Sequence, residues 1–178
     1  MGMFIETPVS TQVEQINQIT FRFSDSPIMM DISRNCEDKY LKFDFHKATQ
    51  SWIVKANYLV AEKLIAVIDQ YSMDISEDAR LALNDIIDRK VKGRIYLKMM
   101  PDKTNHFVFD FVPKKKTFKS WFITKINATW DGREYSCAAT RENAKHILKW
   151  LGKDKNIFVL TEHAKEQLTM LTQDIRWR

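Results

Sequence analysis

The sequence predicts an α+β protein in which two similar hairpin–helix–helix units are joined by a basic antiparallel sheet. Short runs of alternating apolar and polar residues predict strands, and apolar residues spaced three and four apart behind Ser, Thr or Asn predict helices. Two such passes occur with matched spacing. We therefore expect an acidic N-terminal unit over 1–88, a basic β-rich connecting segment over 89–125, and a C-terminal unit over 126–178 that repeats the first.

Length and composition set the class of protein. With 178 residues and a high aromatic content, the chain is long enough to bury a core. No apolar run approaches the roughly 18 residues of a membrane span, and the N-terminus lacks the order of a signal peptide. The two cysteines give no disulfide framework. We expect a cytoplasmic protein of a reducing compartment with no membrane association.

The N-terminal region reads as strands followed by helices. Residues 13–16 have the spacing of one helical turn, whereas residues 19–23 alternate as a strand. Further strands are expected over 28–32, 39–45 and 51–56, the last two as a hairpin.

Two capped helices follow. Asn57 is a good N-cap for a helix with one apolar face, and Ser76 caps a second helix that begins with two acids, where the helix dipole favours negative charge. The apolar positions of the two helices are Val60, Leu64, Val67 and Tyr71, then Ala79, Leu83 and Ile86.

The C-terminal region repeats the predicted order of a hairpin followed by helices. Strands are expected over 126–130 and 133–138, around an Asp131-Gly132 pair that is typical of a type I′ hairpin turn. Thr140 caps a helix, residues 156–160 read as a short strand, and a last helix follows. The apolar positions of the helix after Thr140 are Ala144, Ile147, Leu148 and Leu151.

The spacing of the two passes indicates an internal repeat. Trp52 precedes the cap Asn57 by five residues, as Tyr135 precedes Thr140. The second caps follow Trp52 and Tyr135 by 24 and 26 residues, a difference that one loop absorbs. Repeats at fixed spacing indicate one supersecondary unit used twice, although any two hairpin–helix–helix units align about this well.

Charge is distributed unevenly along the chain. Residues 1–88 hold 8 Lys/Arg and 14 Asp/Glu, a balance of −6, whereas residues 89–178 hold 20 and 9, a balance of +11; together they give the net +5. An acidic half joined to a basic half indicates that the two halves bind partners of opposite charge. Small proteins can also acquire such an uneven charge distribution by chance.

Basic residues are densest over 89–125, where they alternate with aromatic and β-branched residues. Such a surface can neutralise phosphates and stack bases. The sequence therefore predicts a nucleic-acid-binding protein without catalysis that favours single-stranded or forked DNA, with RNA left open. The candidate binding residues are Lys90, Lys92, Arg94, Lys98, Lys114, Lys115, Lys116, Lys119 and Trp121.

Alternation places these side chains on faces of the expected sheet. Arg94, Tyr96 and Lys98 share one face, and the row of phenylalanines at 107, 109 and 111 is expected in the core. Trp52 and Trp130 are also expected in the core, since each lies in a hairpin that leads to a helix.

The first hairpin has a recognisable pattern, FDFHKATQSWIV over 43–54, in which a strand, a basic turn and a return strand with a Trp lead to a helix. This pattern resembles the HARP domain, and residues 126–151 resemble it more weakly, with Tyr135 in place of Trp52. HARP domains lie beside the motor of annealing helicases and related proteins. The resemblance implies binding of single-stranded or forked DNA. The chain has no Gly-x-x-x-x-Gly-Lys-Ser/Thr loop, so no ATPase motor is expected.

The sequence contains little that predicts an active site. Asp25 with Glu37-x-Lys39 fits the carboxylates and lysine of metal-dependent nucleases, but Glu37 lies in a polar run that reads as a loop. The four histidines have no partner at i+4 and no nearby cysteine. We expect no catalytic activity, no cofactor and no metal.

A protein-binding regulator or inhibitor is the alternative, such as a small factor encoded by a phage or another mobile element that docks on a nucleic-acid enzyme. The acidic N-terminal half favours this reading, because negative charge repels DNA and is attracted to a basic groove on a protein.

Overall fold

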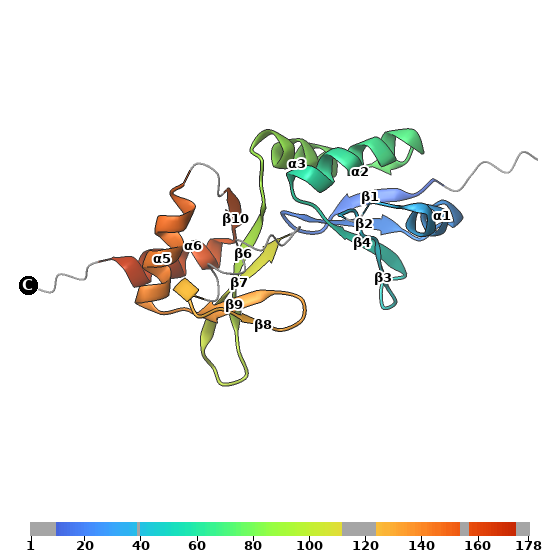
Figure 1. Cartoon of the computed structure of the whole chain (residues 1–178). Coiled ribbons are helices and arrows are strands. Elements are labelled where there is room, and N and C mark those ends of the chain that lie inside the picture. Colours follow the sequence, from blue (N-terminus) through green and yellow to red (C-terminus); the bar gives the residue numbers. More distant parts are fainter. Residues whose placement is uncertain (1–9, 39, 112–123, 154–156, 174–178) are drawn as a thin grey trace, which may run out of the picture. The chain divides into compact units, whose positions relative to one another are not determined.

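The computed structural model describes residues 10–38, 40–111, 124–153 and 157–173. The chain is α+β and divides into two compact units, Met1–Asp88 and Arg89–Arg178, each with one mixed five-stranded sheet (Figure 1). The boundary between the units falls at the residue where the charge balance reverses. The negative and positive halves of the sequence are therefore two separate folded bodies.

The first unit contains five strands and three helices among its described residues. In chain order they are β1 (Gln12–Gln15), β2 (Thr20–Ser24), α1 (Pro27–Asn35), β3 (Asp44–His46), β4 (Ser51–Lys55), α2 (Tyr58–Gln70), β5 (Asp74–Ile75) and α3 (Glu77–Asp88).

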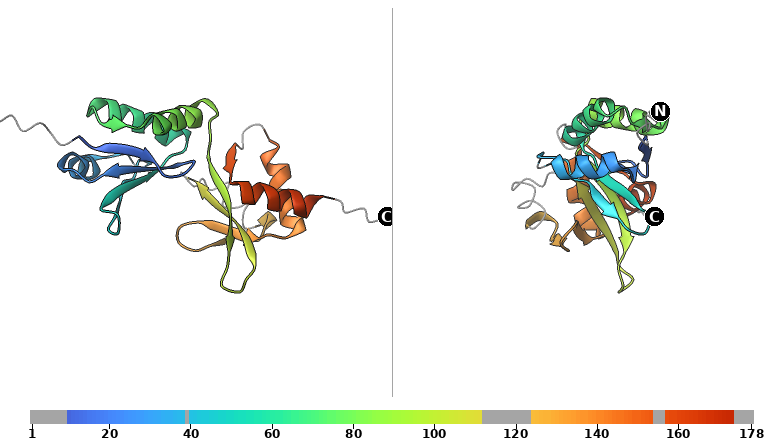
Figure 2. Two further views of the ribbon diagram at one scale, coloured as in Figure 1. Left: turned by 180° about the vertical axis from the view of Figure 1, so that it is seen from behind. Right: turned by 90° about the vertical axis from the view of Figure 1, so that its right-hand side faces the viewer.

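The sheet of the first unit has the order β3-β4-β2-β1-β5. Its neighbours are antiparallel except β5, which runs parallel to β1. Helices α2 and α3 lie side by side over one face of this sheet (Figures 1 and 2). The largest buried side chains of the unit are Ile19, Phe21, Phe23, Met29, Leu64, Ile68, Leu83 and Ile86.

Two early segments differ from the sequence-based expectation. The expected strand over 28–32 is helix α1, in which Ser26 is the N-cap and accepts a hydrogen bond from the backbone N–H of Met29. Pro27 occupies the first helical position, where a backbone N–H would have no hydrogen-bond partner within the helix. The expected helical turn at 13–16 is strand β1, since its pairing with β2 and β5 outweighs a local spacing of two apolar residues.

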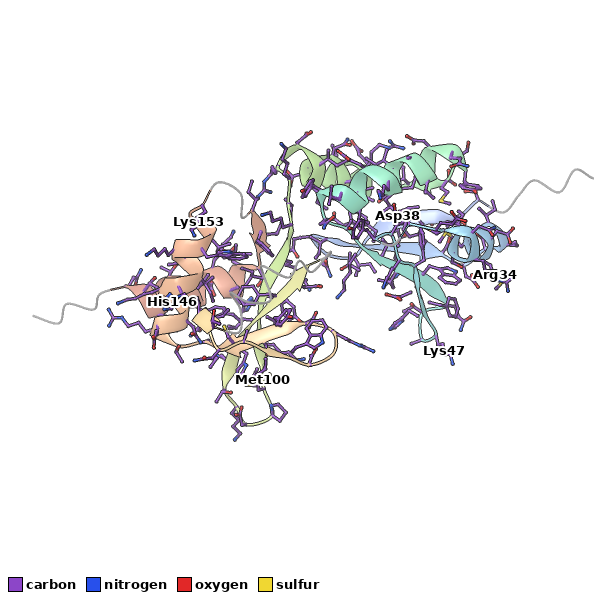
Figure 3. The ribbon with its side chains drawn as sticks, viewed as in Figure 1. Arg34, Asp38, Lys47, Met100, His146 and Lys153 are labelled. Carbon is purple, nitrogen blue, oxygen red and sulfur yellow. The ribbon has the colours of Figure 1, made fainter. Side chains whose placement is uncertain are left out.

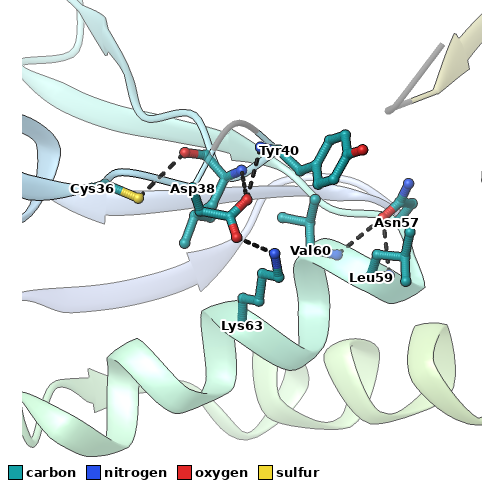
Figure 4. A network of polar contacts seen from close by, with 8 residues as sticks. Cys36, Asp38, Tyr40, Asn57, Leu59, Val60 and Lys63 are labelled. Carbon is teal, nitrogen blue, oxygen red and sulfur yellow. Dashed lines mark hydrogen bonds and ion pairs between the residues drawn. The ribbon is translucent and has the colours of Figure 1, made fainter.

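The segment before β3 is held by a polar network centred on Asp38 (Figure 4). The Asp38 carboxylate accepts hydrogen bonds from the backbone N–H groups of Tyr40 and Leu41 and pairs with the Lys63 ammonium on α2. The bond from Lys63 and those from the backbone lower the pKa of Asp38. This turn explains why the strand expected over 39–45 is confined to Asp44–His46 among the described residues.

The second unit has five strands and two helices in the part that the structure describes. They are β6 (Gly93–Met99), β7 (Asn105–Phe111), β8 (Thr129–Trp130), β9 (Tyr135–Ala138), α5 (Arg141–Leu151), β10 (Phe158–Leu160) and α6 (Glu162–Thr172).

The sheet of the second unit has the order β8-β9-β7-β6-β10, antiparallel throughout except for β10, which runs parallel to β6. This order and these directions are those of β3-β4-β2-β1-β5 in the first unit. Residues 89–125, expected as a connecting segment, therefore contribute β6 and β7 to the sheet of the second unit. The reason is that β7 pairs with β9 and β6 with β10.

The core of the second unit lies between this sheet and its helices. Phe107 and Phe109 are fully buried, as expected, while the side chain of Phe111 lies outside the described set. On α5, Trp150 joins the core together with Ala144 and Ile147, whereas Leu148, also expected on the apolar face, is exposed. The other buried members of this core are Ile95, Ile126, Ala128, Tyr135, Cys137, Ala144, Ile147, Phe158 and Leu168.

The β8–β9 hairpin also departs from expectation. A type I′ turn needs positive φ at both central residues, but only Gly132, at +98°, has it in this loop. Four residues separate the paired Trp130 and Tyr135, and the Asp131 carboxylate accepts hydrogen bonds from the backbone N–H groups of Arg133 and Glu134. Trp130, expected in the core, is 44% exposed.

Across the described ranges, no helix is both long and apolar enough to cross a membrane.

Candidate nucleic-acid interface

The structure places four of the nine candidate binding residues. Lys90, Lys92, Arg94 and Lys98 lie on or just before β6, within the second unit. The remaining candidates lie outside the described residues: Lys114, Lys115, Lys116, Lys119 and Trp121.

The residues before β6 differ in exposure. Lys90 is exposed and has a positive φ of 53°. Lys92 is half-buried, and its backbone N–H donates to the carbonyl of Ile157, which ties the start of β6 to the approach to β10. Of these two, Lys90 has the more accessible side chain.

Arg94 and Tyr96 share one face of β6 but are engaged within the unit. The Arg94 guanidinium lies 3.8 Å from the Asp110 carboxylate across the β6–β7 pair and 4.7 Å from the centroid of the Tyr96 ring. The Tyr96 hydroxyl donates to Glu134 at 2.6 Å, and burial together with this bond raises the pKa of Tyr96. Asp110 thus compensates the charge of Arg94 locally. The Arg94 guanidinium is therefore less available to bind a phosphate.

Lys98 lies at the exposed end of the same face. Its charge contributes to the lowered pKa of Asp131, which is caused mainly by the backbone N–H groups of Glu134 and Arg133. In the same hairpin, the exposed Trp130 ring rests on Tyr135, with ring centroids 4.8 Å apart. Single-strand binders use exposed aromatic rings of this kind to stack bases, together with cationic side chains that follow the backbone.

A cavity of about 280 Å³ lies beside α5. Among the described residues, five side chains line it: Lys125, which precedes β8, and His146, Lys149, Trp150 and Lys153 from α5 and its C-terminal end. None of the five is acidic. Figure 3 shows His146 and Lys153 projecting from this helix.

Helical spacing brings the α5 residues to one face. His146, Lys149, Trp150 and Lys153 fall at i, i+3, i+4 and i+7, the positions that lie above one another on a helix. Trp150 anchors this face: it is 6% exposed, and its ring lies 5.0 Å from that of Phe158 and 6.4 Å from that of Phe109. The side chains of His146, Lys149 and Lys153 therefore surround the buried ring of Trp150.

The charges around the cavity are not compensated by the described residues. Within those ranges the side chains of Lys125, His146, Lys149 and Lys153 form no ion pair or hydrogen bond. Three lysines that share one hollow repel one another, and a bound anion relieves that repulsion. The arrangement is suited to a phosphate.

The sequence contained a signal for part of this cavity. His146, Lys149 and Lys153 share the face of the helix after Thr140, and tracing its basic side as well as its apolar side would have found them. Lys125 lies 21 residues before His146, and only the tertiary structure brings it to the same place.

The nuclease-like pattern does not form a metal site among the described residues. The Asp25 carboxylate accepts a hydrogen bond from the Trp52 indole N–H at 2.9 Å, and Lys39 lies outside the described ranges. No group of three His, Cys, Asp or Glu side chains suited to a metal occurs in those ranges.

Searches of protein-family models, curated proteins and solved structures gave no match to this chain.

Proposed function

We propose that this protein binds nucleic acid without catalysis, through its second unit. The observation that carries the proposal is the cavity lined by Lys125, His146, Lys149 and Lys153, in a unit with a balance of +11. Lysines that neutralise phosphates release condensed counterions, which drives binding without sequence readout.

The preferred form is a single strand or a fork. Stacking on an aromatic ring contributes about 1 to 3 kcal/mol per base and requires an unpaired base. Trp130, with 44% of its surface exposed, supports this preference, and Trp121 remains the stacking residue expected from the sequence. A blunt duplex is the competing form, because α5 carries Arg141, Lys145 and Lys149 on its polar surface and a basic helix can enter a major groove.

The common strand order supports a finer proposal, that both units descend from one hairpin–helix–helix plan with additional strands. In the first unit, the pattern that resembles the HARP domain forms the β3–β4 hairpin, with exposed Lys47 in its turn (Figure 3). This turn would be a second, weaker contact to DNA in an otherwise acidic unit.

Fluorescence anisotropy tests the proposal with a labelled single strand, a fork and a blunt duplex of equal length. We expect the full chain to bind the single strand and the fork more tightly than the duplex at moderate salt. Trp130→Ala should reduce this difference, while Trp130→Phe should retain it. Equal binding of all three forms would contradict the stacking contribution, and no binding of any form would contradict the proposal.

A protein partner for the first unit is the second candidate. The separation of charge into two folded bodies favours it, since the first unit retains its balance of −6 by itself. If no nucleic acid binds the full chain, capture of a basic protein that is lost on charge reversal in α3 would support this function instead.

A further inference from the structure

We propose that the cavity beside α5 takes the terminal phosphate of a nucleic-acid strand, so that the protein recognises a phosphorylated strand end. This inference rests on the proposed function and specifies the ligand of the same cavity. It is carried by the size of the cavity, by its charge, by the burial of Trp150 and by a comparison with the first unit.

The size of the cavity favours an end over the middle of a strand. Its volume of about 280 Å³ lies just below the roughly 300 to 1,000 Å³ of small-molecule sites. A hollow of this size accepts one phosphate with part of its sugar. A continuous strand would instead require an open groove along which successive phosphates lie.

The charge of the cavity also favours an end. An internal phosphodiester carries one negative charge, whereas a phosphomonoester carries about −1.5 to −2 at pH 7 and offers three acceptor oxygens. Lys125, Lys149 and Lys153 provide three ammonium groups around one hollow, with His146 beside them. Three ammonium groups match the three terminal oxygens of a monoester, one more than the two non-bridging oxygens of a diester.

Trp150 does not act as a base-stacking ring here. It is 6% exposed and already packs against Phe158 and Phe109, so a base has little ring surface to cover. The group recognised in this cavity is therefore the phosphate. The first base would lie outside the hollow.

The first unit shows that the fold does not need these cations. Counted from the N-caps Asn57 and Thr140, the positions of Lys149 and Lys153 correspond to Ala66 and Gln70 on α2. A lysine near a helix C-terminus complements the helix dipole, yet α2 has no basic residue in its last turn. Two of the three lysines are thus specific to the second unit.

At the corresponding position of the first unit, the cationic side chain is already paired with an acid. His146 lies six residues after its N-cap, as Lys63 does on α2. The Lys63 ammonium pairs with Asp38 and lies 5.5 Å from the centroid of the Tyr40 ring (Figure 4). An acid therefore neutralises the cation there, whereas the described residues that line the cavity of the second unit include no acid.

The test compares oligonucleotides of one sequence that carry a 5′-phosphate, a 3′-phosphate or no terminal phosphate. Anisotropy is measured with the full-length protein, with a cavity variant (Lys149→Ala with Lys153→Ala) and with a control variant (Lys42→Ala with Lys165→Ala). Both variants lose two positive charges, and both control lysines are exposed residues outside the cavity. Thermal unfolding verifies that each variant is folded.

We expect wild type and the control variant to bind one phosphorylated end at least about tenfold more tightly than the unphosphorylated strand, the factor for one charge-assisted hydrogen bond. The cavity variant should lose this preference while it retains part of its binding to the unphosphorylated strand. The 5′- and 3′-phosphate arms identify which end is recognised.

Two results would overturn the inference. Equal binding of phosphorylated and unphosphorylated strands by wild type would refute recognition of an end and leave the proposed function intact. Binding of inorganic phosphate or a nucleoside monophosphate, with no oligonucleotide bound, would refute both and assign the cavity to a small phosphorylated molecule. In either case the cavity variant shows whether these lysines take part.

Discussion

The helix caps Asn57 and Thr140 allow the stability contributions of a buried and an exposed N-cap to be compared within a single chain. Asn57 is 4% exposed, and its side-chain carbonyl accepts hydrogen bonds from the backbone N–H groups of Leu59 and Val60, both at 3.0 Å. Thr140 is exposed, and its hydroxyl accepts one bond, from the backbone N–H of Asn143 at 3.2 Å. The two caps differ in burial and in the number of N–H groups they satisfy.

We expect Asn57→Ala to destabilise the first unit by about 2 kcal/mol, at the upper end for a cap, because it leaves one buried and one part-buried donor without partners. Thr140→Ala should cost the second unit only about 0.5 to 1 kcal/mol, since water replaces the lost acceptor. For a unit of this size, 2 kcal/mol corresponds to a lowering of Tm by roughly 8 to 16 °C.

Calorimetry of the full chain measures both effects, with Asn57→Asp and Thr140→Ser as controls that keep a capping oxygen. We expect Asn57→Asp to recover most of the stability lost in Asn57→Ala. Equal losses for the two alanine variants, or no loss for Asn57→Ala, would refute the assignment of Asn57 as a buried cap.

Three further predictions follow from the backbone, the thiols and the lysine triplet. Gly132→Ala should destabilise the second unit by about 1 to 2 kcal/mol because φ is +98°, whereas Gly152→Ala, with only ordinary contacts at its Cβ, should be neutral or slightly stabilising in the same denaturant titration. Burial raises the pKa of the Cys137 thiol to about 12, so a thiol reagent at pH 8 should modify Cys36 in the native protein and Cys137 only after unfolding. Reaction of both at one rate would contradict its burial. Replacing Lys114–Lys116 by Ala should leave Tm unchanged and reduce the salt dependence of DNA binding by about 0.7 to 0.9 in log–log slope per lost contact; an unchanged slope would remove these lysines from the interface.

Local sequence signals predicted the later helices and the second strand of each hairpin. Asn57, Thr140 and Thr161 are the N-caps observed, and residues 51–55 and 135–138 are strands as expected. These elements were predictable because each combines a capping or turn residue with an apolar period of its own type.

Elements that depend on distant partners were not predictable in this way. Strand β5 has two residues and exists through its pairing with β1, so it leaves no periodic signal. The placement of β6 and β7 inside the second sheet depends on their pairing with β10 and β9. The helix α1 had a usable signal in Ser26-Pro27, an N-cap followed by a residue suited to the first helical position.

The candidate site was predictable only in its charge. The sequence located the excess of lysine and arginine after residue 88, and the boundary of the second unit coincides with it. It did not show that Asp110 compensates Arg94, or that Lys125 meets the basic face of α5 in one cavity. Both facts depend on contacts between segments that are well separated along the chain.

The salt dependence of single-strand binding measures whether the cavity beside α5 contacts phosphate. Affinity is measured by anisotropy over a series of salt concentrations for wild type, the cavity variant and the control variant. We predict that the cavity variant lowers the log–log slope by about 0.7, the value for the one phosphate that both lysines contact, while the control variant leaves it unchanged. Equal slopes in the cavity variant and wild type would show that Lys149 and Lys153 make no contact with phosphate and would contradict the account.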